Sequence, residues 1–292
     1  MRVGVTGAGG LLGSTLVPLW RAAGADVTGW TRRDLDVTDP DAVRGALRVV
    51  RPDVVIHAAA WTDVDGAEQH EDDAMRVNRD GTAEVGAACA ETGATTVYLS
   101  SDYVFDGRAT APMATDRPLH PLGAYARSKA AGEAAVRAAG GTWMVVRTGW
   151  LYGPGGRNFV DTMRAAAEER RAVRVVDDQV GAPTSARLIA EVVWRLLPLG
   201  TERVWHVAAA GATSWYGVAR SVYQAAGAPA EDVQPCSTAE AARPAPRPAY
   251  SVLDVEATAA ALGRPLPGWE EQVRSYVQHR RLPACGWVEA AG

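Results

Sequence analysis

Near its start the chain reads Val3-Gly4-Val5-Thr6-Gly7-Ala8-Gly9-Gly10-Leu11-Leu12-Gly13, a short β-like run that leads into a glycine-rich turn. The glycines follow a Gly-x-x-Gly-x-x-Gly spacing, and a helical pattern follows from Leu11 to about Ala23. Glycine permits a tight turn and lets backbone amides approach a phosphate at the start of a helix. Glycine loops are common, but a strand, this turn and a helix together predict dinucleotide binding. The predicted contact residues are Gly7, Gly9, Gly10, Leu11, Leu12 and Gly13.

Strand-like and helix-like segments alternate beyond this turn as far as Trp150. Strands are expected at residues 27–30, 54–56, 95–100 and 143–147, and helices at 41–50, 83–92 and 126–139. This alternation predicts an α/β fold with a Rossmann doubly wound parallel sheet. The pattern then weakens, with helices expected near 159–171, 186–197 and 270–280.

These patterns also suggest a division of the chain. We expect an NAD(P)-binding Rossmann domain over residues 1–150, with a returning strand near 203–208. Residues 151–292 would form a smaller mixed α/β C-terminal substrate domain, interleaved with the core.

Composition excludes several other classes of protein. A net charge of −4 gives no drive toward nucleic acid, and no apolar run approaches the ~20 residues that span a membrane. The three cysteines are widely spaced, so neither a disulfide framework nor a zinc site is expected. No apolar segment with a cleavage site precedes the turn, which is typical of a cytoplasmic protein. We therefore expect no nucleic-acid, membrane or metal partner.

The end of the second predicted strand indicates which dinucleotide binds. An acidic residue there would bind the ribose diol of NAD, whereas arginine favours the 2′-phosphate of NADP. The sequence reads Trp30-Thr31-Arg32-Arg33, which predicts NADPH through Arg32 and Arg33. Asp34 follows directly, so NADH remains possible, and two solvated surface arginines are the competing interpretation.

One lysine, Lys129, occurs among the 30 basic residues, and it lies four residues after Tyr125. On a helix this spacing places both side chains on one face. Reduction of a ketone needs a proton donor beside the carbonyl oxygen, and a nearby ammonium lowers the pKa of a phenol. The ammonium can also bond the ribose of the cofactor. We therefore predict Tyr125 and Lys129 as a catalytic pair that also contacts the cofactor.

We expect a second hydroxyl group, which would form a hydrogen bond with the carbonyl oxygen of the ketone, at the end of the strand near 95–100. Ligands of doubly wound folds lie beyond the carboxyl ends of the strands. Ser100-Ser101-Asp102 stands at that place, and Ser101 is our candidate. A serine that only caps a turn is the alternative.

Together these motifs resemble the dTDP-4-dehydrorhamnose reductase family of extended short-chain dehydrogenases. The resemblance runs from Thr6 to about Leu253. The stretch Ser101-Asp102-Tyr103-Val104-Phe105-Asp106-Gly107 carries most of its specificity. The other matching segments are the glycine turn, 36–37, 58–65, 77–78, Tyr125 with Lys129, 147–153, 158–159, 178–184 and 247–253.

The resemblance implies further roles for individual residues. Asp36 and Val37 would flank the adenine, and Ala58, Ala60 and Thr62 would line the cofactor, with Thr62 also near the substrate. Ser101 replaces the usual threonine and keeps the hydroxyl. The residues implied to contact the substrate are Thr62, Ser101, Asp102, Tyr125, Trp150 and Asn158, and Asn158 could equally cap a helix. Some members bind magnesium through glutamates, but Thr15 stands at one of those positions, so no metal is expected.

The implied reaction is NADPH-dependent reduction of the 4-keto group of a nucleotide-activated 6-deoxysugar, with dTDP as the expected nucleotide. One alternative is a sugar-nucleotide epimerase or dehydratase on the same scaffold. A dehydratase would usually carry an aspartate–glutamate pair, whereas Tyr103 follows Asp102 here. Another is a non-catalytic nucleotide-binding subunit, like the β subunit of methionine adenosyltransferase. The oligomeric state is left open between monomer and homodimer.

Overall fold

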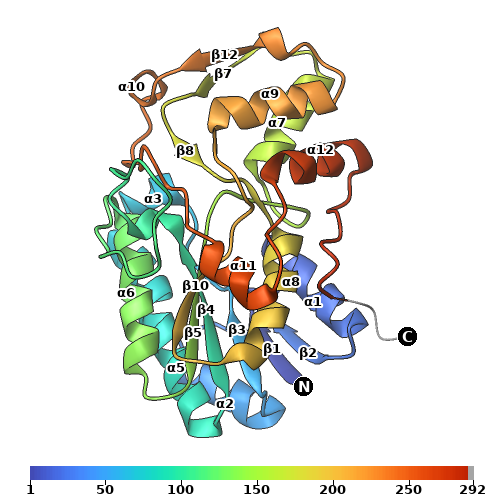
Figure 1. The fold of residues 1–292 in the computed structure, drawn as a ribbon. Helices are drawn as coiled ribbons and strands as arrows, with labels where there is room; N and C mark the ends of the chain where they lie inside the picture. The colour runs from blue at the N-terminus through green and yellow to red at the C-terminus, as the bar shows by residue number, and fades with distance from the viewer. Residues whose placement is uncertain (289–292) are drawn as a thin grey trace.

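A six-stranded parallel sheet forms the centre of the molecule in a computed structural model, which describes residues 1–288 (Figure 1). Its strands are β1 (Arg2–Thr6), β2 (Asp26–Trp30), β3 (Val54–His57), β4 (Thr95–Ser101), β5 (Trp143–Thr148) and β10 (Arg203–His206). They lie in the order β10-β5-β4-β3-β1-β2. The chain leaves β1 toward β2 on one side and returns to β3 on the other, so a crevice opens above the carboxyl ends of β1 and β3. The predicted Rossmann fold is confirmed.

Two layers of helices cover this sheet. One layer contains α2 (Pro40–Val50), α5 (Gly81–Thr92) and α6 (Ala124–Ala138), which pack side by side. The other contains α1 (Gly13–Ala22), α8 (Ala186–Leu196) and α11 (Glu256–Leu262). The link between β3 and α5 is formed by α3 (Val64–Ala67), α4 (Glu71–Met75) and the π-helix η1 (Arg76–Asp80).

The later half of the chain builds a smaller unit above the carboxyl ends of the strands (Figure 1). Helices α7 (Phe159–Glu168), α9 (Trp215–Ala225) and α12 (Trp269–His279) pack together there. Three pairs of short strands join them, namely β6 (Leu151–Tyr152) with β9 (Thr184–Ser185), β7 (Val173–Val176) with β12 (Val233–Cys236), and β8 (Val180–Gly181) with β11 (Thr213–Ser214). The remaining short elements are the 3-10 helices η2 (Asp102–Val104), η3 (Leu197–Leu199) and η4 (Ala230–Asp232) and the α-helix α10 (Thr238–Ala241).

Local sequence explains where the main elements form. All four residues of β3 are buried, as expected of a strand covered on both faces. Helix α2 begins after Asp39, whose carboxylate accepts hydrogen bonds from the amides of Asp41 and Ala42, and Pro40 occupies its first position. Helix α8 begins at the cap Ser185, which accepts from the amide of Leu188.

The structure differs from the sequence-based expectation at a few elements. Helix α1 begins at Gly13 rather than Leu11, because the Gly10 amide closes a turn on the Gly7 carbonyl at 2.9 Å. Helices α9 and α11 were not predicted. Among residues 1–288, no helix combines the length and the apolar character needed to cross a membrane.

Candidate active site

A cavity of about 1120 Å³ extends along the carboxyl ends of the sheet strands. It runs from the glycine turn to the β5–β6 junction and the start of α9. Nearly all residues predicted for the site line it, although they come from many separate segments. They are Gly7, Gly9, Gly10, Leu11, Leu12, Gly13, Arg32, Arg33, Asp36, Val37, Ala58, Ala60, Thr62, Ser101, Asp102, Tyr125, Lys129 and Trp150.

The glycine turn leaves no room for side chains on its inner side. Gly7 has a φ of 70°, and a Cβ there would lie 2.6 Å from the amide nitrogen of Ala59. A Cβ on Gly13 would lie 2.4 Å from the carbonyl oxygen of Gly7. The turn therefore packs closely between β1 and β3, directly before the N-terminus of α1, and this arrangement fits an anionic pyrophosphate.

Acidic and basic groups are separated at the end of β2. The Asp34 carboxylate accepts hydrogen bonds from the Thr31 amide at 2.8 Å and the Thr31 hydroxyl at 2.7 Å. Hydrogen bonds from the amide and hydroxyl of Thr38 hold the pKa of Asp36 below its usual range. Both carboxylates are thus engaged within their own turns, while the exposed Arg32 and Arg33 line the cavity.

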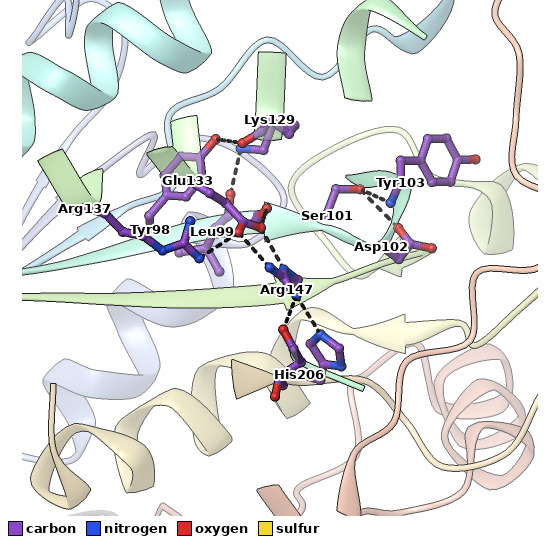
Figure 2. A network of polar contacts seen from close by, with 12 residues as sticks. Tyr98, Leu99, Ser101, Asp102, Tyr103, Lys129, Glu133, Arg137, Arg147 and His206 are labelled. Atoms are coloured by element: carbon purple, nitrogen blue, oxygen red, sulfur yellow. Dashed lines mark hydrogen bonds and ion pairs between the residues drawn. The ribbon is translucent and has the colours of Figure 1, made fainter. Parts of the chain in front are cut away.

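Ser101 and Asp102 lie where β4 ends, and their side chains contact each other (Figure 2). The Ser101 hydroxyl donates to an Asp102 carboxylate oxygen at 3.1 Å and accepts from the Tyr103 amide at 3.1 Å. Burial raises the pKa of Asp102 to about 7, although hydrogen bonds from Ser251 and Ser101 oppose this rise. Two groups therefore line the cavity here: the hydroxyl of Ser101 and the carboxyl of Asp102, whose pKa is unusually high.

Tyr125 lies in the first turn of α6, and contacts from α3 and α4 fix this end of the helix. A carboxylate oxygen of Glu68 accepts from the Ala124 amide at 2.7 Å, and Arg127 forms two hydrogen bonds with Glu71 at 2.7 and 2.8 Å. Burial raises the pKa of the Tyr125 phenol to about 12, with a hydrogen bond to Ser101 opposing it. The phenol is therefore protonated at neutral pH.

Lys129 follows one turn later and is almost fully buried. Its ammonium donates to the Leu99 carbonyl oxygen at 2.6 Å and lies 4.3 Å from the centroid of the Tyr98 ring (Figure 2). The sequence predicted that this ammonium would act directly on the phenol of Tyr125, but here it is directed at β4. Burial lowers the pKa of Lys129 to about 7, and the negative charge of Glu133 opposes this shift.

Aromatic side chains form the wall at the substrate end of the cavity. Trp150 stacks on Trp215 with ring centroids 3.6 Å apart and an angle of 5° between the planes. Phe159 contacts Trp215 edge-on at 4.6 Å. Trp150 also has a φ of 50°, a strained backbone conformation that clusters at functional sites. Sequence reasoning missed Trp215, although Ser214 caps α9 and was a usable helix-start signal.

Asn158 is the exception among the predicted site residues, because it does not contribute to this cavity. Its side-chain oxygen accepts from the Asp161 amide at 2.9 Å, and its amide group donates to the Gly153 carbonyl at 3.0 Å. The residue therefore caps α7, and its contact with the substrate stays a prediction. Sequence reasoning also missed Arg76 and Arg157, which line the cavity. No cluster of metal-ligating side chains occurs within residues 1–288.

The Rossmann sheet, the tight glycine turn and the tyrosine–lysine pair in one cavity define a nucleotide-binding protein of the short-chain dehydrogenase class. The family model of the RmlD substrate binding domain matches residues 1–282, and the chain belongs to this family. It is 44% identical to the dTDP-4-dehydrorhamnose reductase of Mycobacterium tuberculosis, over 97% of each chain. The family expected from the motifs is thereby confirmed.

Two further comparisons describe the range of similar proteins. The chain is 40% identical to the dTDP-4-keto-6-deoxy-D-glucose reductase of Streptomyces niveus, covering 91% of this chain and 92% of that protein. The crystal structure of dTDP-4-dehydrorhamnose reductase from Bacillus anthracis in complex with NADP superposes with a TM-score of 0.90. That match has 34% identity and covers 94% of this chain and 98% of the other.

Proposed function

We propose that this protein reduces the 4-keto group of a nucleotide-activated 6-deoxysugar with NADPH, with dTDP as the expected nucleotide. One observation carries the proposal: a single cavity connects the glycine turn with Ser101, Tyr125 and Lys129. Family membership supports the reaction class, and relatives that reduce different keto sugars leave the particular sugar open. Monomer or homodimer, and a cytoplasmic location, stay predictions.

The cofactor is assigned to the half of the cavity nearest β1 and β2. We assign the pyrophosphate to the glycine turn, the adenine to the neighbourhood of Asp36 and Val37, and the 2′-phosphate to Arg32 and Arg33. The part of the cavity that leads from the glycine turn toward α6 is lined by Ala58, Ala60 and Thr62. When bound, the nicotinamide supplies a hydride.

Tyr125 is assigned as the proton donor to the carbonyl oxygen, and Ser101 as the hydroxyl that bonds the same oxygen. A pKa of about 12 keeps the phenol protonated, which is the state that an acid requires. An ammonium has three N–H donors. The bond from Lys129 to Leu99 therefore leaves two for the cofactor ribose and for the phenolate that forms as the proton leaves.

The test is a panel of 4-keto sugar nucleotides incubated with the protein and NADPH, with NADPH consumption followed and products identified by NMR. One NADPH should be oxidised for each sugar reduced. Sugar conversion without net NADPH oxidation would instead indicate an epimerase or dehydratase. Binding of nucleotide without any conversion would indicate a regulatory subunit.

The variant Arg32→Ala/Arg33→Ala is expected to weaken NADPH binding by about tenfold, because it removes charge-assisted bonds to the 2′-phosphate. NADH affinity should change little, since NADH lacks that phosphate. Titration of both cofactors into wild type and variant checks this. Arg195→Ala, at an exposed position on α8, is the control and should bind as wild type does. Equal wild-type affinities for NADPH and NADH would refute the assignment.

A further inference from the structure

A buried ion pair lies beneath the proposed catalytic residues (Figure 2). Arg147, at the end of β5, donates two hydrogen bonds to Glu133 of α6, from Nε at 2.8 Å and from Nη2 at 2.9 Å. Glu133 is fully buried, and Arg147 is only 3% exposed. The role proposed for the site does not by itself account for this pair.

Both partners have further contacts that fix their positions. Glu133 accepts from the Ser100 hydroxyl at 2.6 Å and from Arg137 at 3.0 Å. Arg147 donates to the Thr115 carbonyl at 2.9 Å, and its Nη1 lies 3.4 Å from Nε2 of His206. Burial would raise the pKa of Glu133, but the hydrogen bonds and charges of these partners outweigh it and hold the pKa below its usual range.

The pair connects the elements that carry the proposed chemistry. Tyr125, Lys129 and Glu133 follow one another at intervals of four on α6, so they share one helix face. Ser100 immediately precedes Ser101, and Arg147 lies two residues before Gly149 on the cavity wall. The ion pair thus holds α6 against the carboxyl ends of β4 and β5.

Stability alone is a weak reason for such a pair. Taking two charges out of water costs about as much as their attraction returns, and apolar replacements of similar volume are often neutral or stabilising. An effect on a neighbouring charge is a stronger reason, and Lys129 lies one helical turn away.

Four titratable groups surround Lys129: Tyr98 on β4, whose ring lies under the ammonium, His57 on β3, whose pKa its charge affects, and Tyr125 and Glu133, each one helical turn away on α6. Burial lowers the pKa of His57 to about 3, with the charge of Lys129 adding to this effect, so His57 is neutral. The pKa values of Tyr98 and Tyr125 are both raised by burial, so both phenols are neutral as well. Of the four, Glu133 is the one charged at neutral pH.

We propose that Glu133 is a positioning residue whose carboxylate, held by Arg147 and Ser100, keeps the Lys129 ammonium charged and α6 in register with β4 and β5. This inference rests on the role proposed for Lys129. Glu133 acts through that lysine and does not itself touch the reacting atoms.

The test is the pH dependence of kcat/KM in Glu133→Gln, which removes the charge and keeps the size. The charged form of Lys129 is active and is lost as pH rises through its pKa. Without the carboxylate that pKa falls, so the alkaline limb of the profile should move to lower pH by about 1 unit. Activity should recover toward the wild-type value below the shifted limb.

Glu191→Gln is the matched control. Glu191 is a fully buried glutamate on α8 that accepts from Arg187 at 2.7 Å and from the Trp287 amide at 3.0 Å. Its replacement should lower the melting temperature and leave the alkaline limb in place. A folded Glu133→Gln protein whose limb coincides with that of wild type would overturn the proposal.

Glu133→Met/Arg147→Met covers the case in which Glu133→Gln does not fold, because it removes both charges and fills the space. If this variant folds, an alkaline limb of its kcat/KM profile that lies at lower pH than in wild type supports the proposal. An alkaline limb at the wild-type pH contradicts it. Failure of both variants to fold would make the pair purely structural and would also overturn the proposal.

The affinity for NADPH, measured by fluorescence as a function of pH, provides a readout that needs no substrate. A wild type that binds NADPH but reduces no keto sugar would refute the proposed function instead.

Discussion

Replacing Tyr125 by phenylalanine is expected to lower kcat/KM for a 4-keto sugar nucleotide by at least ~100-fold and up to ~10,000-fold, the range of positioned acid catalysis. Phenylalanine keeps the ring that packs 6.2 Å from Tyr103 and removes only the hydroxyl. The loss should therefore appear in kcat, measured as the rate of NADPH oxidation at saturating substrate.

Controls separate this loss from damage to the fold. The melting temperature of Tyr125→Phe should stay near wild type, because Glu68 and the Arg127–Glu71 pair still fix the start of α6. Turnover within a few-fold of wild type would mean that another group donates the proton. The carboxyl of Asp102, with its pKa of about 7, would then be the first candidate.

Lys129→Arg is expected to be nearly as harmful as Lys129→Ala, with a loss of similar order, although it retains the positive charge. The ammonium is confined between the Leu99 carbonyl and the face of Tyr98. Guanidinium is a larger planar group with dispersed charge, so it cannot place a compact donor there. Steady-state kinetics of both variants, beside their melting curves, check this.

The double variant of Tyr125→Phe with Lys129→Arg should be little worse than Tyr125→Phe alone, since residues that act as a unit are not additive. Near-wild-type turnover of Lys129→Arg would show that any cation suffices. The inference drawn from the single lysine of the sequence would then be wrong.

Sequence patterns predicted the first half of the fold well, because its strands are buried runs and its helices have clear starts. The β3 strand and α2, which Asp39 caps and Pro40 begins, are examples. The later half was harder because β6, β8, β9 and β11 are two residues long and carry no periodicity. Their positions depend on tertiary packing.

In the site, too, sequence reasoning found residues that stand out in the sequence itself, and it missed contacts that depend on tertiary packing. The composition singled out Lys129, and the structure places it in the cavity beside Tyr125. The direction of its ammonium toward Leu99 could not be predicted, since it depends on how α6 packs on β4. Glu133 and Arg147 lie on a helix and a strand, and nothing in their spacing indicates that they pair in the core.

The central claim is tested most directly by the fate of labelled hydrogen. NADPH carrying deuterium on either face of nicotinamide C4 would be incubated with a 4-keto sugar nucleotide, and the product examined by NMR. We predict that one of the two labels appears at C4 of the sugar, with one NADPH consumed for each product molecule. Conversion of the sugar with NADPH unchanged and no deuterium at C4 would contradict the account.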